Sequence, residues 1–185
     1  MKIKYITLTL ILTLCFTFLA GCKSYNVEYI NEHMKNDVTN LQSANYRRLI
    51  KSSEVAIFEE KIVSTRSDDV FNQAITTIEL AGVEDGNQYV SSSDERTVSA
   101  EAMKNNMQLK EEYFVKDSLV IDETSLTGTL NETSVLEVLG IPSAKDVLVT
   151  VYLYEDLTLH YISIEYTDSN TNYAVSISIE YFYYE

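Results

Sequence analysis

The sequence contains only two cysteines among its 185 residues, Cys15 and Cys22. Both cysteines lie within the first 22 residues of the chain. The rest of the chain therefore has no free thiol and cannot form a disulfide. The 164 residues that follow position 21 must be stabilised by a hydrophobic core, and this length suits one domain of ordinary size.

The sequence also lacks the common signatures of catalysis. His33 and His160 are its only histidines, and neither has a partner at the spacing of a zinc site. No G-x-S-x-G elbow or phosphate-binding glycine loop is present. The acidic pairs lie beside turn residues or on polar faces, where solvated surface charge is expected: Asp68-Asp69, Glu111-Glu112, Asp122-Glu123 and Glu155-Asp156. We therefore expect no enzymatic activity, no catalytic residue, no cofactor and no metal site.

One acidic segment partly matches a calcium loop. Asp168 to Asn172 places side-chain oxygens at the first three ligand positions. Tyr173 then replaces the glycine that the sharp turn needs, and Ile179 stands where the bidentate glutamate should be. The same residue types are typical of any hairpin loop, so a turn is expected here.

The first 22 residues have the layout of a bacterial lipoprotein signal. Lys2 and Lys4 give a cationic start, and the run from Tyr5 to Ala20 carries no charge. This run is too short for a comfortable membrane span of about 20 residues. Leu19-Ala20-Gly21-Cys22 matches the lipobox, in which an aliphatic residue and two small residues precede an acylated cysteine. We expect residues 1–21 to be a signal peptide and Cys22 to be the lipidation site; an ordinary cleaved signal or an uncleaved anchor is the alternative.

The chain after this signal is strongly acidic. The sequence has 14 Lys and Arg against 28 Asp and Glu, and removal of Lys2 and Lys4 leaves a formal charge of −16. Such a charge repels nucleic acid and anionic headgroups. We therefore expect no nucleic-acid partner and attachment to a membrane through lipid alone, in the bacterial cell envelope with the domain outside the cytoplasm.

Residues 22–30 are predicted to be a lipidated tether, and residues 31–185 a single extracytoplasmic domain. Its first element is predicted to be an amphipathic helix from Asn31 to Ser52. The apolar positions Met34, Val38, Leu41, Leu49 and Ile50 suit one helix face.

Two strands are predicted next. Glu54 to Val63 is rich in β-branched and aromatic residues. Asp68 to Gly82 fits either a helix face or a strand face. The β-branched residues from Ile75 to Ile78 favour a strand, because such side chains lose χ1 freedom in a helix.

The middle of the chain is less regular. The polar stretch from Tyr89 to Met107 is expected to form a pair of exposed strands or a loop. Glu112–Val115 and Leu119–Ile121 are predicted to form a tight hairpin. Ser134–Leu139 is predicted to be a short helix that opens at Asn131 or Thr133 and closes at Gly140 and Pro142.

The C-terminal third predicts an antiparallel meander of three strands, Val147–Tyr154, Leu157–Thr167 and Asn172–Tyr184. In the last strand, apolar and aromatic residues alternate with small polar ones, so one face should be buried. A change of phase near Tyr161 predicts a bulge in the middle strand. The first strand is apolar on both parities, and we expect it to be covered on both faces.

In the order of these elements the chain resembles lipoproteins of the lipoprotein-carrier half-barrel type. The run Glu111–Glu123 is also similar to the tyrosine-bearing hairpins of small extracellular lipoproteins with that fold. The resemblance implies an α+β fold in which a curved antiparallel sheet packs on one or two helices and leaves an apolar cavity. It carries over no ligand-binding residues.

Two functions follow from these features. The first is binding of an apolar ligand such as a lipid in a cradle between sheet and helix. The alternative is a surface module that contacts a protein or glycan through a tyrosine-rich sheet. Eight of the fourteen tyrosines lie between Tyr152 and Tyr184, and no Lys or Arg follows Lys145. An apolar concave face favours the first function, and exposed tyrosines over a filled core favour the second.

Overall fold

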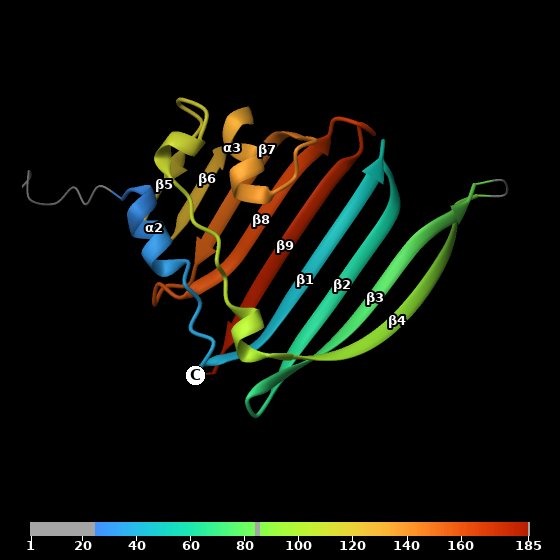
Figure 1. The fold of residues 1–185 in the computed structure, drawn as a ribbon, viewed down its shortest axis with the longest axis horizontal. Helices are drawn as coiled ribbons and strands as arrows, with labels where there is room; N and C mark the ends of the chain where they lie inside the picture. Colours follow the sequence, from blue (N-terminus) through green and yellow to red (C-terminus); the bar gives the residue numbers. More distant parts are fainter. Residues whose placement is uncertain (1–24, 84–85, 185) are drawn as a thin grey trace, which may run out of the picture.

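The computed structural model describes residues 25–83 and 86–184, and its main feature is one open antiparallel sheet (Figure 1). The strands run in the order β4-β3-β2-β1-β9-β8-β7-β6-β5. Their bounds are β1 Leu41–Ser52, β2 Val55–Ser67, β3 Val70–Gly82, β4 Gln88–Ser99, β5 Val120–Ile121, β6 Ser125–Thr129, β7 Ala144–Leu153, β8 Leu159–Asp168 and β9 Ala174–Tyr183. The fold is α+β with an antiparallel sheet, as predicted, but this open sheet is larger than the predicted half-barrel. β1 joins the early strands to the C-terminal meander through β9.

Two α-helices and two 3₁₀ helices lie on one face of this sheet, which we call the inner face. They are α2 (Val27–His33), α3 (Glu132–Leu139), η1 (Ala100–Met103) and η2 (Glu111–Tyr113). Figure 1 shows α2 and α3 in front of the half that contains β5 to β9, with no helix in front of β3 and β4. Within residues 25–83 and 86–184, no helix lies on the opposite face, which we call the outer face.

The main core lies between these helices and the β5–β9 half. Its fully buried side chains include Ile30, Met34, Leu126, Val149 and Leu159. Gly128 is required for this packing, because a Cβ there would lie 2.6 Å from the ring of Phe114. The absence of a side chain on β6 thus lets an aromatic ring rest directly on the strand.

The predicted helix from Asn31 to Ser52 is wrong. A helix ends at His33, Asp37 caps a turn by accepting a bond from the Thr39 amide at 2.9 Å, and β1 begins at Leu41. This segment forms a strand because β1 pairs with β2 on one side and with β9 on the other along nearly its whole length. Tertiary pairing of this kind overrides a helical spacing of apolar residues.

The folded part also begins earlier than predicted. The Asn26 side chain accepts a hydrogen bond from the Tyr29 amide at 2.8 Å and caps α2. Val27 and Ile30 are buried, so these residues belong to the domain and not to a tether. Every buried residue that the structure describes lies at or after Val27, so a chain of residues 23–185 contains all of the described core.

The central segments agree only in part with prediction. Residues 54–63 and 68–82 are strands, as predicted. Residues 89–107 form one exposed strand followed by η1. The predicted hairpin of residues 112–115 and 119–121 is wrong, since the first part is η2 and β5 pairs with β6.

The short helix and the C-terminal meander are confirmed. The Asn131 side chain accepts a bond from the Ser134 amide at 3.0 Å, and Gly140 ends α3 with a φ of 67°. The pairing of β7 with β8 shifts by one residue between Tyr152 and Leu153. This shift places the predicted bulge at His160.

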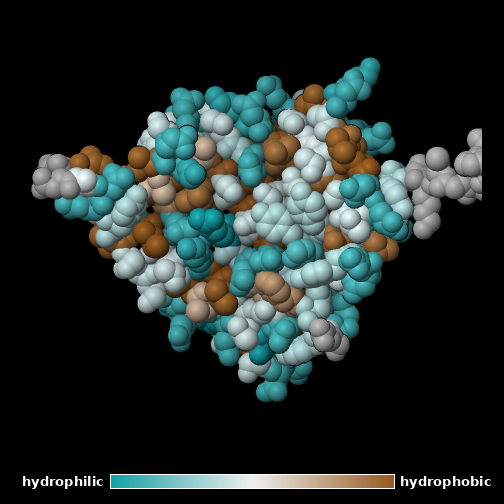
Figure 2. All heavy atoms as spheres, turned by 180° about the vertical axis from the view of Figure 1, so that it is seen from behind, coloured by the Kyte–Doolittle hydropathy of each residue, from teal (hydrophilic) through white to brown (hydrophobic). Residues whose placement is uncertain are grey.

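The expectation that β7 is covered on both faces is wrong. Val147, Val149 and Val151 are buried on the inner face, whereas Leu148 and Tyr152 are 37% and 46% exposed on the outer face. Figure 2 shows this outer face mostly in the teal and pale colours of polar and weakly polar residues. No element of the described chain packs on the outer face, so the apolar residues that β7 places there are exposed to solvent.

Candidate functional site

The inner face continues beyond the helices as a surface of apolar side chains, which we call the apolar patch. The strand register places its residues in rows. One row crosses four strands and contains Ile179, Tyr46, Ile62 and Ile75 as successive partners. Two rows along, Ile50 lies between Val175 and Phe58. Side chains in such rows point to the same face of a sheet.

These side chains are less buried than those of the main core. Apart from Val175, the patch residues are half-buried: Tyr46, Ile50, Phe58, Ile62, Ile75, Ile177 and Ile179. Val149 and Val151, on the same face beneath the helices, are completely buried. The difference follows from the positions of α2 and α3, which pack on β6 and β7 (Figure 1). The apolar patch is thus the part of the inner face that the fold leaves partly open.

A small pocket continues the apolar patch under η1. It has a volume of about 200 Å³, and Tyr46, Ile62, Ile179 and Tyr181 form its floor. Met103 and its neighbours in η1 form one wall. The Gln73 side chain, beside the pocket, donates a hydrogen bond to Ser64 Oγ at 2.9 Å, which satisfies polar groups at its edge.

One cation stands within the apolar patch. Arg48 occupies the row between those of Tyr46 and Ile50, and its guanidinium lies 5.8 Å from the centroid of the Phe58 ring. Its Nε is buried and has no hydrogen-bond partner. Burial raises the pKa of the nearby Tyr166 hydroxyl, and Arg48 opposes that rise.

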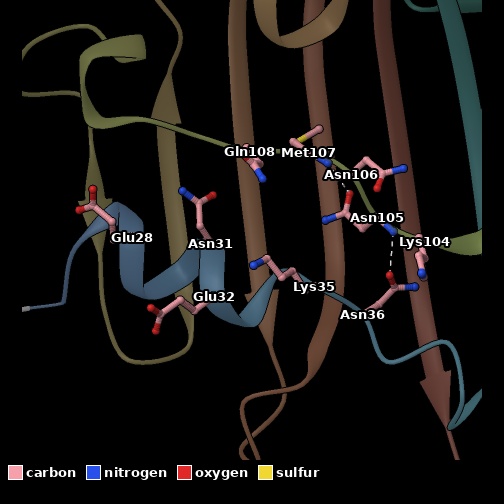
Figure 3. Close-up of a pocket in the computed structure, with 10 residues that line it drawn as sticks. All are labelled: Glu28, Asn31, Glu32, Lys35, Asn36, Lys104, Asn105, Asn106, Met107 and Gln108. Atoms are coloured by element: carbon pink, nitrogen blue, oxygen red, sulfur yellow. Dashed lines mark hydrogen bonds between the residues drawn. The ribbon is translucent and has the colours of Figure 1, made fainter.

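The segment that carries η1 is fastened to α2 by asparagine side chains. Asn31 accepts a bond from the Leu109 amide at 2.9 Å, and Asn36 accepts one from the Asn105 amide at 2.7 Å. Asn105 in turn donates to the Met34 carbonyl at 2.8 Å. Figure 3 shows Asn31, Asn36 and Asn105 among the residues that line a polar groove. The volume of this groove is about 470 Å³. The bonds fix the position of η1 over the pocket.

A second depression lies at the end of the sheet where β9 finishes. Its volume is about 700 Å³, and its lining includes Tyr154, Phe182, Tyr183 and Tyr184 with the acidic Glu155 and Asp156. Tyr154 stacks on His160 with 4.1 Å between ring centroids. This depression joins aromatic rings to carboxylates, in contrast to the apolar patch.

The residues singled out from the sequence lie apart. Cys22 and residues 1–21 lie outside the described residues. His33 shares a hydrogen bond with the Tyr29 carbonyl at 2.8 Å, and His160 lies 3.3 Å from Glu180. Among the residues that the structure describes, no three His, Cys, Asp or Glu side chains are grouped as metal ligands.

The calcium-like segment is an ordinary capped turn. One carboxylate oxygen of Asp168 accepts bonds from the amides of Asn170 at 2.9 Å and Thr171 at 3.1 Å. The other accepts a bond from Ser143 Oγ at 2.8 Å. The Ser143 hydroxyl, followed by the Thr171 amide, lowers the pKa of this carboxyl below its ordinary value.

No protein-family model matches the chain, and no curated protein matches it either. Within the described residues, none of the helices has the length and apolar character that crossing a bilayer requires. The functional argument therefore depends on the apolar patch and its pocket.

Sequence reasoning missed this site because it placed β1 in a helix. The signal was present in the alternation along β1. Ala44, Tyr46, Arg48 and Ile50 occupy every second position, and the residues between them are polar except for Leu49. Alternation of this kind is typical of a strand with one buried face. Once β1 is a strand, the apolar residues of β2 and β9 become its neighbours.

The tyrosine on the pocket floor predicts a loss of stability at high pH. Burial raises the pKa of Tyr181 from 10.0 to about 12, so folding favours its neutral form. This contribution is complete below pH 10.0 and is lost as the pH rises towards about 12, at a cost of about 2–3 kcal/mol.

In urea unfolding at increasing pH, Tyr181→Phe should lose less stability than the unsubstituted chain. Tyr184→Phe, at a residue 54% exposed, is the control; an unchanged alkaline loss in Tyr181→Phe would contradict the prediction.

Proposed function

We propose that the chain is a membrane-anchored lipoprotein whose domain binds an apolar ligand, such as the acyl chain of a lipid, against the apolar patch. The observation that carries this proposal is the row of Ile179, Tyr46, Ile62 and Ile75, which crosses four strands and stays partly open. In the other half of the sheet, α2 and α3 cover the inner face where they pack on β6 and β7.

Physical chemistry favours an apolar occupant. Each Å² of apolar surface removed from water contributes about 25 cal/mol. A ligand that lies along the row covers side chains from β9, β1, β2 and β3 together, and the pocket under η1 can receive its end. Ligand sites are typically such apolar concavities with few polar groups. In this proposal the open sheet acts as one wall of a half-barrel, and η1 with its fastened segment acts as the rim.

The membrane anchor rests on the lipobox and on the short distance to the fold. Only residues 23–26 separate Cys22 from the start of α2 at Val27. An extended chain of this length spans at most roughly 18 Å. The domain would therefore sit close to the bilayer surface, where apolar ligands are abundant, in spite of its acidic charge.

A neutral apolar dye tests the binding proposal. We expect N-phenyl-1-naphthylamine, titrated into residues 23–185 without lipid, to show saturable fluorescence. Ile62→Gln should weaken dye binding at least about fivefold, because it places an amide in the pocket floor. Thermal melting of each variant checks that the fold is retained.

The matched control is the next residue of β2. Val63 points to the outer face and is 47% exposed, so Val63→Gln should leave dye binding unchanged. Dye binding that is not saturable, or that falls equally in Ile62→Gln and Val63→Gln, would contradict the proposal.

The second candidate function is contact with a glycan or a peptide through tyrosines. The aromatic depression at the end of β9 favours it, as does the outer-face pair Tyr152 and Tyr161, whose ring centroids lie 6.1 Å apart. Aromatic rings of this kind combine apolar area with a polar edge. This candidate expects Ile62→Gln to have no effect on the function, so the same pair of variants separates the two.

A further inference from the structure

Arg48 is a cation of the apolar patch that acts on the hydroxyls of Tyr46 and Tyr166, while its buried Nε has no hydrogen-bond partner. In its row, Ile177 lies on one side and Glu60 on the other, while Tyr46 and Ile50 flank it along β1. The guanidinium lies over the ring of Phe58. It therefore stands in a half-buried and largely apolar environment.

The other arginines of the early strands are engaged. Arg66 donates to the carbonyls of Val38 and Asp68, and Arg96 donates to Gln73 Oε1 at 2.7 Å. Arg47 precedes Arg48 in β1 and lies on the outer face, where its guanidinium makes an ion pair with the Glu59 carboxylate at 2.7 Å. Among the described residues, no carboxylate lies within ion-pair distance of Arg48, and its buried Nε donates to nothing. A buried donor without an acceptor carries a free-energy cost in the fold, and an anion beside the guanidinium would offset part of it.

We propose that Arg48 binds the carboxylate of a single-chain fatty acid whose hydrocarbon lies on the apolar patch. This inference rests on the proposed function and names the class of ligand. A guanidinium matches a carboxylate in geometry, with two parallel N–H···O bonds that are stronger than neutral ones. Tyr46 lies two residues from Arg48 on the same face of β1, at a distance of roughly 7 Å along the strand. The hydrocarbon can therefore run from Arg48 to the pocket under η1.

Two sets of carboxylates oppose an anionic ligand. Glu60 is the direct cross-strand partner of Arg48, and the full chain carries a formal charge of −14. Exposed charges farther away than about 8 Å are screened at physiological salt, whereas a half-buried guanidinium is screened less. Glu60 is therefore the nearby carboxylate that repels an anionic ligand at Arg48, and its removal should strengthen binding of that ligand.

The test compares two ligands that differ only in the headgroup. Decanoic acid, ionised at neutral pH, and the neutral 1-decanol are used to displace N-phenyl-1-naphthylamine from residues 23–185. In the unsubstituted chain decanoic acid should bind more tightly than decanol. In Arg48→Met the ratio of the two affinities should fall at least about tenfold. Arg47→Met, one residue away on the outer face, should keep the original ratio.

Glu60→Gln supplies an independent change in the opposite direction. It should raise the affinity for decanoic acid about threefold or more and leave that for decanol unaltered, since only the acid is repelled by Glu60. An affinity ratio that stays the same in both Arg48→Met and Glu60→Gln overturns the role of Arg48 while the apolar site stands. Failure of both ligands to displace the dye overturns the proposed function as well.

Discussion

A chain that carries Cys22→Ser is expected to lose its attachment to the membrane. The reason is chemical, because a serine hydroxyl cannot form the thioether that a lipidated cysteine carries. Two or more acyl chains hold a protein stably on a bilayer, whereas a chain of strongly acidic character has no other attraction to anionic lipid. Fractionation of cells and the mass of the N-terminal peptide measure this effect.

The control for this change is provided by the other cysteine. Cys15 lies in the segment predicted to be removed, so Cys15→Ser should leave the lipidated, membrane-bound product intact. If the Cys22→Ser protein were processed and retained at the membrane like the original, the lipobox interpretation would be wrong.

The largest loss of stability is expected from Phe71→Ala. Phe71 lies on the inner face of β3 and is completely buried, although neither α2 nor α3 lies in front of that strand (Figure 1). The Arg66 guanidinium lies 5.7 Å from the ring centroid and donates to the carbonyls of Val38 and Leu41. Truncation removes both the buried ring and the surface on which Arg66 rests, at an expected cost of about 3–5 kcal/mol in the free energy of unfolding.

Substitution of the neighbouring residue tests whether the loss of stability comes from the burial of Phe71 or from a general sensitivity of β3 to substitution. Val70 precedes Phe71, points to the outer face and is 36% exposed. Val70→Ala should cost less than about 1 kcal/mol. Urea unfolding of both variants gives the comparison, and a Phe71→Ala loss of similar size to that of Val70→Ala would mean that the β3 register is inverted.

Local sequence predicts the C-terminal part of the fold well. The strands β7 to β9 follow one another in the chain, and the turn at Asp168 to Asn172 carries the residues that close it. Asn131 and Gly140 mark both ends of α3 in the same way. In each case the decisive contact is made by residues close together in the sequence, so a pattern within a short window contains the information.

The start of the domain could not be predicted from such windows. Leu41 to Ser52 has apolar residues at both helical and strand spacing, and its strand state depends on partners in β2 and β9. The bare outer face of β7 is a similar case, because Leu148 and Tyr152 look like core residues by composition. Whether they are covered is decided by where the helices lie, and the helices lie on the other face only.

The same limit explains what could be predicted of the candidate site. The alternation in the last strand places Ile177 and Ile179 on one face, and in the structure both lie half-buried on the inner face. Their neighbours Tyr46 and Ile62 could be brought to them only through the pairing of β1. Arg48 gave no signal in the sequence, since an arginine in a predicted helix is typical of a solvent-exposed surface.

The place of β1 in the sheet has a consequence for how the protein is made. Its central pairing joins Ala44, near the start of the domain, to Tyr181, near its end. The two halves of the sheet therefore cannot meet until the last strand has been synthesised, and pairing over such long sequence separations is slow. Under the proposed function the chain crosses a membrane before it folds, and this delay would keep the polypeptide unfolded during that crossing.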